Sequence, residues 1–344
     1  MNVQQRKDLL VQLGHYMKSN DEPWLSVQRK AFAENNWFTP AFVQLSVENI
    51  AANYLSPTAL QQLIDQYNIP DQQPFTQKVG IVMAGNIPLV GFHDLLCVFL
   101  SGHIAMIKPS SKDEVLITHL VKKLAEWEPQ TQEYIYIREM LKKCDAYIAT
   151  GSNNSSRYFE YYFSKYPHII RKNRTSVAVL NGTEDEGQLE KLADDIHQYF
   201  GLGCRNVTKL YVPEGYNFLP LLEAFNKYDH FINHNKYKNN YDYQLAMHIL
   251  NNQYYMTNGS MLLVENPSPF SPIGQIHYEY YTNREEVIRQ LTADNTIQCV
   301  IAENKTAFGN AQCPQLCDYA DGVDTMQFLM EIGGGRVQEI GGRI

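Results

Sequence analysis

The pattern of apolar and polar residues divides the chain into a helical start and a longer part in which strands alternate with helices. Apolar residues within 9–17 recur on one face of a helix. Thr39-Pro40 and Ser56-Pro57 predict the starts of two further helices, because serine or threonine before proline is typical of an N-cap and first turn. We therefore predict that residues 1–75 form a helical N-terminal segment that packs on the domain after it.

Short apolar runs then alternate with amphipathic segments. These runs are continuous, which is typical of strands buried on both faces. The predicted order is strand 79–83, helix 89–101, strand 104–107, helix 113–126, a further helix to about residue 144, and strand 146–149. Such alternation predicts the α/β class with a doubly wound parallel sheet, and we assign residues 76–180 to a cofactor-binding domain.

The second half of the chain repeats this alternation more loosely. Its predicted elements are strand 176–180, helix 188–199, a turn and strand near 204–212, a largely helical segment 217–251, strands 260–264 and 275–281, a helix that opens at residue 282, and strand 297–301. We assign residues 181–320 to an α/β catalytic domain and 321–344 to a Gly-rich C-terminal tail.

Composition narrows the class of protein. The 344 residues are enough for two domains or one large α/β unit, and the net charge of −8 argues against a nucleic-acid partner. No apolar run reaches the roughly 18 residues of a membrane span, and we find no signal-peptide pattern. The six scattered cysteines suit free thiols in a reducing compartment, so we expect a cytoplasmic enzyme. Cys313 and Cys317 have no second ligand pair nearby, and no metal site is predicted.

Three turns after predicted strands carry polar residues or glycine. They contain Asn86, residues 108–111, and Gly151-Ser152. In parallel sheets, ligands bind where the carboxyl ends of strands meet helix N-termini, so these turns are candidates for a cofactor site. The G-x-G-x-x-G pattern is absent from them, and a dinucleotide would have to be held in another mode.

A cysteine in a glycine-containing turn is the candidate centre of the chemistry. Cys204 follows Gly201 and Gly203 and precedes the apolar run 210–212. Glycine lets the backbone approach a ligand closely, and a thiol at the mouth of a strand is a candidate nucleophile. The alternative is a buried structural cysteine. The neighbouring Arg205 is either a source of positive potential for a thiolate or a surface charge.

Together and in this order, these motifs resemble the aldehyde dehydrogenase superfamily. The matching stretches are Gly85-Asn86-Ile87-Pro88 for the Trp-Asn-x-Pro turn, Lys108-Pro109-Ser110 for the Lys-Pro-Ser/Ala turn, Thr150-Gly151-Ser152 for the Thr-Gly-Ser turn, and 201–212 for the nucleophile loop. The resemblance implies an aldehyde-dehydrogenase-like fold, with a cofactor domain and a catalytic domain.

The resemblance also implies roles for single residues. Cys204 would be the nucleophile, and Asn86 would donate to the developing oxyanion together with the backbone N–H of Cys204. Lys108 would bond the adenosine ribose, while Gly151 and Ser152 would direct a helix N-terminus toward the cofactor phosphates. The alternatives are that Asn86 only satisfies a turn and that Ser152 is an ordinary N-cap.

The cofactor preference depends on three neighbouring residues. Ser110, Ser111 and Lys112 offer hydroxyls and a cation where NAD-preferring relatives carry an acid. A 2′-phosphate would be favoured there, so the prediction is NADPH rather than NADH. Alternatively or in addition, Ser110 or Ser111 caps the helix that begins near residue 113.

Two departures narrow the resemblance within the superfamily. A Glu-Leu-Gly-Gly segment supplies the hydrolytic base in aldehyde dehydrogenases, but the equivalent residues 171–176 here contain no acid. The chain is also shorter than a typical aldehyde dehydrogenase and has a long helical start. It looks most like the acyl-CoA reductases of the LuxC family, whose members reduce fatty acyl thioesters to aldehydes with NADPH.

We therefore predict an acyl-CoA reductase acting on an acyl-CoA or acyl-carrier thioester. The alternatives are a short-chain acylating aldehyde dehydrogenase, a γ-glutamyl-phosphate-reductase-like enzyme, a Cys-dependent acyltransferase or thioesterase without nucleotide, and a scaffold that kept the fold. The sequence leaves open whether the protein forms a homo-oligomer or has an acyl-transfer partner protein. His93, His103 and His197 are either proton donors or ordinary core and surface histidines.

Overall fold

The chain folds into two compact units in the computed structural model, which describes residues 1–334. The first unit comprises Met1–Asn173 and the chain from Pro314 onward, and the second comprises Arg174–Cys313. The predicted boundary lies between residues 180 and 181, whereas the second unit begins at Arg174. The chain also returns to the first unit at Pro314, within the stretch assigned to the catalytic domain.

The first unit is built on a parallel sheet, as predicted. Its strands lie in the order β3-β2-β1-β4-β5, and every neighbouring pair is parallel. Their bounds are β1 Lys78–Val82, β2 Ile104–Lys108, β3 Ile135–Ile137, β4 Ala146–Thr150 and β5 His168–Arg171. The strand order reverses between β1 and β4, which makes the carboxyl end of this sheet the expected ligand edge.

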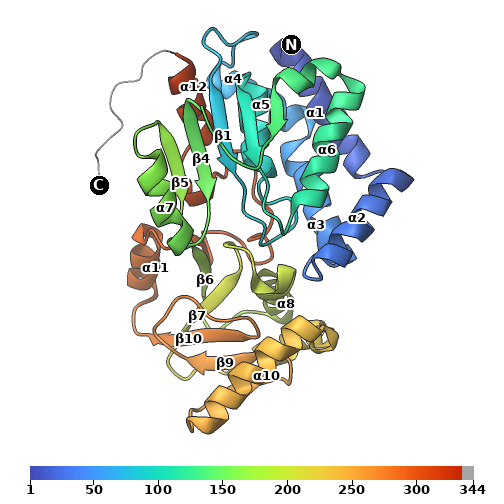
Figure 1. Cartoon of the computed structure of the whole chain (residues 1–344). Helices are drawn as coiled ribbons and strands as arrows, with labels where there is room; N and C mark the ends of the chain where they lie inside the picture. The colour runs from blue at the N-terminus through green and yellow to red at the C-terminus, as the bar shows by residue number, and fades with distance from the viewer. Residues whose placement is uncertain (335–344) are drawn as a thin grey trace. The chain divides into compact units, whose positions relative to one another are not determined.

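The first unit also holds helices, which include the predicted helical start (Figure 1). They are α1 Val3–Met17, α2 Glu22–Glu34, α3 Pro40–Asn49, α4 Pro57–Tyr67, α5 Phe92–Ser101, α6 Glu114–Trp127, α7 Asn153–Phe163 and α12 Thr325–Gly333. The side chains of Thr39 and Ser56 accept hydrogen bonds from the first turns of α3 and α4, as the capping signals predict. α1 and α12 both pack on the apolar α5, so the N-terminal and C-terminal segments share one core with the sheet.

In the first unit, two predicted elements are wrong or incomplete, and one strand is missed. The helix expected to reach residue 144 is absent, and that segment holds a short 3-10 turn and the edge strand β3. Isoleucine and tyrosine favour strands, and Ile135 is buried beside Ala105 of β2. α5 begins at Phe92 instead of residue 89, because Leu89 has a left-handed φ of 58°. Strand β5 is not among the predicted elements.

The second unit holds a mixed sheet with its own helices (Figure 1). The strand order is β11-β6-β7-β10-β9-β8, and only the pairing of β8 with β9 is antiparallel among the described strands. The bounds are β6 Thr175–Val179, α8 Glu186–His197, β7 Val207–Pro213, α9 Leu219–Phe225, α10 Asn235–Leu250, β8 Met256–Thr257, β9 Leu262–Glu265, β10 Gln275–Tyr281, α11 Arg284–Ala293 and β11 Ile297–Ile301. The α/β prediction for this half is confirmed.

The segment assigned to a Gly-rich tail contains a helix in its described part. Met326 and Leu329 of α12 are fully buried, so this stretch belongs to the core of the first unit. Residues 335–344, the last ten residues of the predicted tail, lie outside the described residues. Within residues 1–334, no helix has both the length and the apolarity needed to cross a bilayer.

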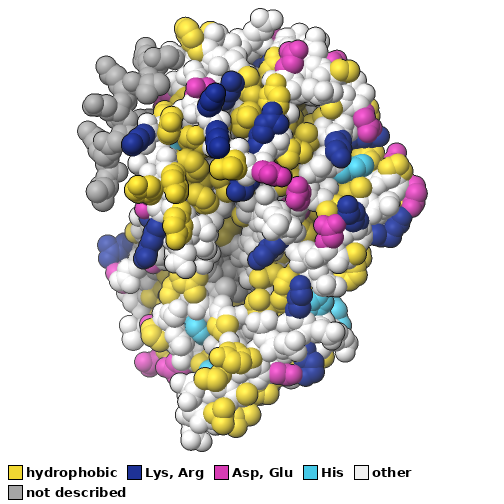
Figure 2. Space-filling model, viewed as in Figure 1, with side chains coloured by type: hydrophobic (Ala, Val, Ile, Leu, Met, Phe, Trp, Pro, Cys, Tyr) yellow, Lys and Arg dark blue, Asp and Glu magenta, His cyan; other side chains and the backbone are white. Residues whose placement is uncertain are grey.

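Apolar side chains are exposed at two helical surfaces (Figure 2). On α7, the most exposed are Tyr158, Tyr161 and Tyr162, which are 64–77% accessible. On and just after α10, Leu250 and Tyr254 are 76% and 73% accessible. Both surfaces are distinct from the turns and the loop that carry the predicted site residues.

Candidate functional site

The three predicted cofactor turns lie at one edge of the first unit's sheet. Val82 at the end of β1 is in register with Lys108 of β2 and with Ala149 of β4. The turns that follow these strands therefore start side by side. They carry all the predicted site residues of this unit: Asn86, Lys108, Ser110, Ser111, Lys112, Gly151 and Ser152.

Two of these turns touch at Gly85. A Cβ at this position would lie 2.5 Å from Ser110 Oγ and 2.6 Å from Ser110 Cβ, so only glycine fits against the β2 turn without a shift. Ser110 Oγ accepts a hydrogen bond from the Lys112 N–H at 3.3 Å, which keeps the serine turned back on its own loop. Asn86, the next residue after Gly85, is half-buried. The close contact places the candidate oxyanion donor and the candidate 2′-phosphate residues on neighbouring loops.

The structure corrects the capping role considered for Ser110 and Ser111. α6 begins at Glu114 with Asp113 at the N-cap position, and neither serine caps the helix. Asp113 is buried and its Oδ2 accepts the Leu89 N–H at 2.7 Å. Burial raises the pKa of the Asp113 carboxyl well above its ordinary value. The aspartate therefore ties the β1 turn to the β2 turn.

Ser152 opens the helix α7, as predicted. Its Oγ accepts a hydrogen bond from the Ser155 N–H at 3.3 Å, and α7 begins at the next residue, Asn153. Gly151 packs against Phe159, because an added Cβ would lie 2.9 Å from that ring. The N-cap interpretation of Ser152 is confirmed, and an N-terminus of this kind attracts anionic groups.

Residues 171–176, which the resemblance equates with the base-bearing segment of aldehyde dehydrogenases, have a structural use here. Arg171 at the end of β5 is buried and pairs with Asp94 of α5 at 2.5 Å. Its second nitrogen donates to Thr325 Oγ1 at the start of α12, at 2.8 Å. The nearby Lys172 pairs with Glu160 of α7. Among residues 171–176 no side chain is a carboxylate that can activate water.

Cys204 lies in the second unit, on a loop between α8 and β7. The loop begins with three consecutive left-handed residues, Tyr199, Phe200 and Gly201, with φ values of 54°, 56° and 73°. Such a conformation costs a non-glycine residue about 1–3 kcal/mol, so the surrounding contacts must hold it in place. The Cys204 thiol is free of any disulfide and half-buried.

Two buried polar residues that the sequence reasoning missed hold this loop. Asn206 Oδ1 accepts the Gly203 N–H at 2.8 Å, and Ser176 Oγ of β6 donates to the Cys204 carbonyl at 3.1 Å. Both side chains are 0% accessible. The position of Asn206, two residues after the cysteine, could have indicated its role from the sequence. Nothing in the local sequence links Ser176 to Cys204.

The other candidate residues are accounted for by ordinary contacts. Arg205 donates to Cys299 Sγ at 3.5 Å. His197 is buried at the end of α8, where its Nδ1 bonds the Ala193 carbonyl at 2.8 Å and burial lowers its pKa to about 4. His103 bonds the Leu329 carbonyl and His93 bonds the Leu316 carbonyl. His103 is buried and His93 half-buried, and each bonds a backbone carbonyl, whereas the buried Nε2 of His197 has no hydrogen-bond partner among the described residues.

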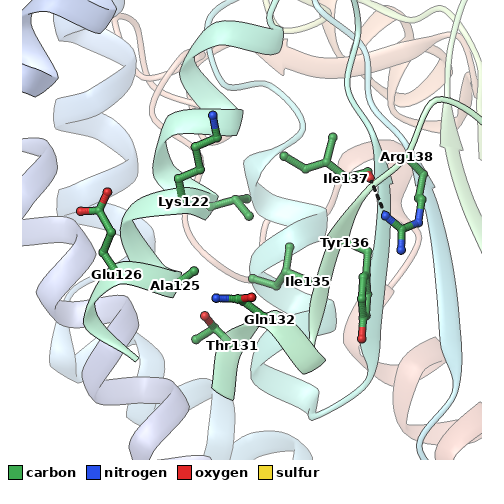
Figure 3. A pocket seen from close by; sticks show the side chains of 10 residues that line it. Lys122, Ala125, Glu126, Thr131, Gln132, Ile135, Tyr136, Ile137 and Arg138 are labelled. Carbon is green, nitrogen blue, oxygen red and sulfur yellow. Dashed lines mark hydrogen bonds between the residues drawn. The ribbon is translucent and has the colours of Figure 1, made fainter. Parts of the chain in front are cut away.

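A cavity of about 550 Å³ lies beside the edge strand β3 (Figure 3). Its wall combines Ile135 and Tyr136 with the charged Lys122 and Arg138, whose guanidinium donates to the Ile137 carbonyl at 3.1 Å. No predicted site residue is among those that line it. The cavity is therefore separate from the turns at the ends of β1, β2 and β4.

Comparison with solved structures identifies the fold. Aldehyde dehydrogenase 21 from Physcomitrella patens, solved in complex with the reaction product succinate, is 12% identical, with a TM-score of 0.69 over 96% of this chain and 84% of that one. Succinic semialdehyde dehydrogenase from Streptococcus pyogenes, solved with NADP+, is 13% identical, with a TM-score of 0.63 over 86% and 75% of the two chains. At such low identity, these matches establish the aldehyde-dehydrogenase-like fold.

Comparison of the sequence with protein families complements the structural matches. No curated protein matches the chain by sequence. The model of the acyl-CoA reductase (LuxC) family matches residues 64–221, a segment that contains every predicted site residue from Asn86 to Cys204. The match and the fold confirm the predicted resemblance and identify this protein as an oxidoreductase related to the acyl-CoA reductase (LuxC) family.

Proposed function

We propose that this protein reduces an acyl thioester, in particular a fatty acyl-CoA, to the aldehyde with NADPH through an acyl-enzyme on Cys204. The observation that carries the proposal is the half-buried Cys204 thiol on a loop held by hydrogen bonds, within the segment that matches the LuxC family. The superfamily resemblance of the turns at Asn86, Lys108 and Gly151 supports the same chemistry.

Cys204 is the residue that exchanges covalent bonds. Its thiolate attacks the thioester carbonyl carbon, the bond from that carbon to the CoA sulfur breaks, and CoA leaves as a thiolate that takes up a proton. The acyl group then remains on Cys204 as a thioester. Addition of hydride to the acyl carbon and cleavage of the bond to the cysteine sulfur would release the aldehyde and regenerate the thiolate.

Asn86 is proposed as the donor to the oxyanion. Its amide N–H, together with the backbone N–H of Cys204, would stabilise the negative charge that develops on the carbonyl oxygen. Asn86 is half-buried on the turn after β1, where the contact of Gly85 with Ser110 restrains the backbone. The two proposed donors belong to different compact units, so the assignment is to be tested by substitution.

The residues at the carboxyl end of the first sheet suit a phosphorylated dinucleotide. The N-terminus of α7 at Ser152 suits a pyrophosphate. Exposed Lys108 would bond the ribose, and Ser110, Ser111 and Lys112 would accept a 2′-phosphate. NADPH bound there would supply the hydride.

The absence of a base in residues 171–176 favours reduction over hydrolysis. Arg171 is held by Asp94 and Thr325, so the segment has cations where hydrolytic relatives need a carboxylate. An acyl group on Cys204 would therefore remain as a thioester until hydride is transferred to it.

One assay tests the proposal. Purified protein is mixed with acyl-CoA of 4 to about 16 carbons, and NADPH absorbance and released CoA are followed with Cys204→Ser in parallel. The expected result is NADPH oxidation that depends on long acyl chains and is lost in Cys204→Ser. NADPH oxidation only with short chains would favour a short-chain acylating dehydrogenase, and oxidation only with γ-glutamyl phosphate would favour that reductase. CoA release without any nucleotide response would favour an acyltransferase or thioesterase. No reaction with any substrate would overturn the proposal.

A further inference from the structure

The backbone on both sides of Cys204 is anchored by buried side chains to which the proposed chemistry assigns no role. We propose that Asn206 and Ser176 are positioning residues, which set the direction of the Cys204 Cα–Cβ bond and of its N–H by fixing the two peptide planes that flank this residue. This inference rests on the proposed function of Cys204 as nucleophile.

Asn206 fixes the peptide plane before Cys204. Its side-chain Oδ1 accepts the Gly203 N–H at 2.8 Å, and its own backbone N–H donates to the Gly203 carbonyl at 3.1 Å. The Gly203 carbonyl and the Cys204 N–H belong to one planar trans peptide and point in opposite directions. Because Asn206 holds the carbonyl on one side, the Cys204 N–H is directed to the other.

The same side chain closes the end of α8. Asn206 Nδ2 donates to the carbonyls of Asp195, Ile196 and Gln198 at 3.1, 3.3 and 2.8 Å. α8 ends at His197, so the carbonyls of Asp195 and Ile196 lie in its last turn, where helix carbonyls lack intrahelical donors. The amide has two hydrogens for three acceptors, so at least one hydrogen is shared.

These contacts require an amide. An aspartate can accept from Gly203 but cannot donate to carbonyls, and a serine is too short to serve both groups. Asn206 is 0% accessible, so any lost partner would stay unsatisfied in the interior.

Ser176 fixes the peptide plane after Cys204. Its Oγ donates to the Cys204 carbonyl at 3.1 Å and accepts the Cys299 N–H of β11 at 3.1 Å. The hydroxyl thus connects the loop to two strands of the sheet. With both flanking planes held, the rotation about the Cys204 N–Cα and Cα–C bonds is set, and so is the direction of its Cα–Cβ bond.

The expected consequence is kinetic. Nucleophilic attack depends on alignment, and a misplacement of about 1 Å costs roughly 100-fold in rate. Asn206→Ala is therefore expected to lower the rate constant of single-turnover CoA release by about 100-fold, with the KM for acyl-CoA changed less than about threefold. Ser176→Ala, which removes one hydroxyl, is expected to lower that rate constant by about tenfold.

Matched controls separate positioning from general stability. Asn258 is another loop asparagine of the second unit, whose Oδ1 accepts the Ser260 and Met261 N–H groups. Ser101 is a buried serine whose Oγ donates to the Val98 carbonyl at 2.9 Å. Asn258→Ala and Ser101→Ala are expected to lower the melting temperature but to leave the rate of CoA release unchanged.

Alkylation of Cys204 by iodoacetamide, followed by peptide mass spectrometry, gives a readout that needs no substrate. Asn206→Ala is expected to change the Cys204 labelling rate at least fivefold, and Asn258→Ala is not. Wild-type rates of labelling and CoA release in both Asn206→Ala and Ser176→Ala would overturn the inference and leave the proposed function intact. A wild-type protein that releases no CoA would overturn the proposed function, while the labelling rates would still decide on positioning. If Asn206→Ala does not fold, the comparison of Ser176→Ala with Ser101→Ala in the rate of CoA release tests the inference by itself.

Discussion

The turns at the carboxyl end of the first unit's sheet and the Cys204 loop of the second unit are built in opposite ways. Lys108, Ser111, Lys112 and Ser152 are exposed on the turns. The side chains of Asn206 and Ser176, which hold the Cys204 loop, are fully buried, and each makes hydrogen bonds to the loop and to a second segment. The turns offer groups that a ligand has to organise, whereas the loop is organised before any substrate arrives.

This difference suits the proposed chemistry. Ordering an exposed lysine on binding costs about 0.5–1.5 kcal/mol of side-chain entropy, which is acceptable for a cofactor that must leave after each turnover. A nucleophile benefits more from a fixed direction than a cofactor-binding group does, because its alignment affects the rate of every turnover. Substitutions of the exposed side chains in the turns should therefore change kinetics at constant stability, and substitutions of the buried side chains near the Cys204 loop should change stability as well.

The largest expected effect is that of Asn86→Ala in the turns. Loss of one oxyanion donor should lower kcat by about 100- to 1,000-fold. Because Asn86 is only half-buried, the melting temperature should stay within about 2 °C of the wild type. Steady-state kinetics and thermal unfolding measure both values. Unchanged kcat would exclude Asn86 as the oxyanion donor, and a large loss of stability would break the contrast between the two regions.

Next comes a pH effect near the Cys204 loop. Burial lowers the pKa of His197 to about 4, so the unfolded chain binds more protons than the folded one between about pH 6.5 and 4, and stability falls on acidification. The loss amounts to about 3 kcal/mol. Burial raises the pKa of Asp195 to about 6, so this carboxyl acts in the opposite direction in much of the same range.

His197→Phe should expose the Asp195 contribution. A phenylalanine can occupy the aromatic surroundings of Phe225, Tyr228 and Phe231 without a titratable group. Urea unfolding at pH 7, 6, 5 and 4 should show that the variant gains stability relative to wild type as the pH falls. The control is His230→Phe at an exposed position. Parallel curves for wild type and His197→Phe would contradict the assignment.

Gly85→Ala tests the tight contact between the β1 turn and the β2 turn. The new Cβ would lie 2.6 Å from Ser110 Cβ, so a loop has to move, at a cost of about 1–3 kcal/mol. We expect a lower unfolding free energy and a KM for NADPH raised about tenfold, since the Ser110 turn shifts. Gly187→Ala serves as control, because its added Cβ would meet only the Asp185 side chain at 3.4 Å. An unchanged KM would remove the Ser110 turn from the cofactor site.

Lys112→Ala should have the smallest effect. An exposed cation that meets a 2′-phosphate contributes about 1 kcal/mol, so the KM for NADPH should rise about fivefold while that for NADH stays constant. The stability should not change. Lys142→Ala, an exposed lysine before β4, is the control. Equal effects on both nucleotides would assign the 2′-phosphate contact to another residue.

Several features could be predicted because their cause is local. Thr39, Ser56 and Ser152 cap the helices that their sequence context predicts, and the apolar runs at β1, β2 and β4 are strands. The order of the motifs around Asn86 and Cys204 predicted the fold and the family. The helix expected up to residue 144 failed because β3 depends on its pairing with β2, which no local pattern contains.

By itself, the sequence determined the α/β class, the three turns at one sheet edge, a cysteine in a glycine-containing turn, and the lack of an acid in residues 171–176. Only the tertiary structure decided what holds that cysteine, since Ser176 and the Cys204 carbonyl are 28 residues apart along the chain. The same holds for the buried pair of Arg171 and Asp94, which lie 77 residues apart. Propensity and periodicity act over a few residues, whereas a buried polar side chain finds its partners wherever the fold places them.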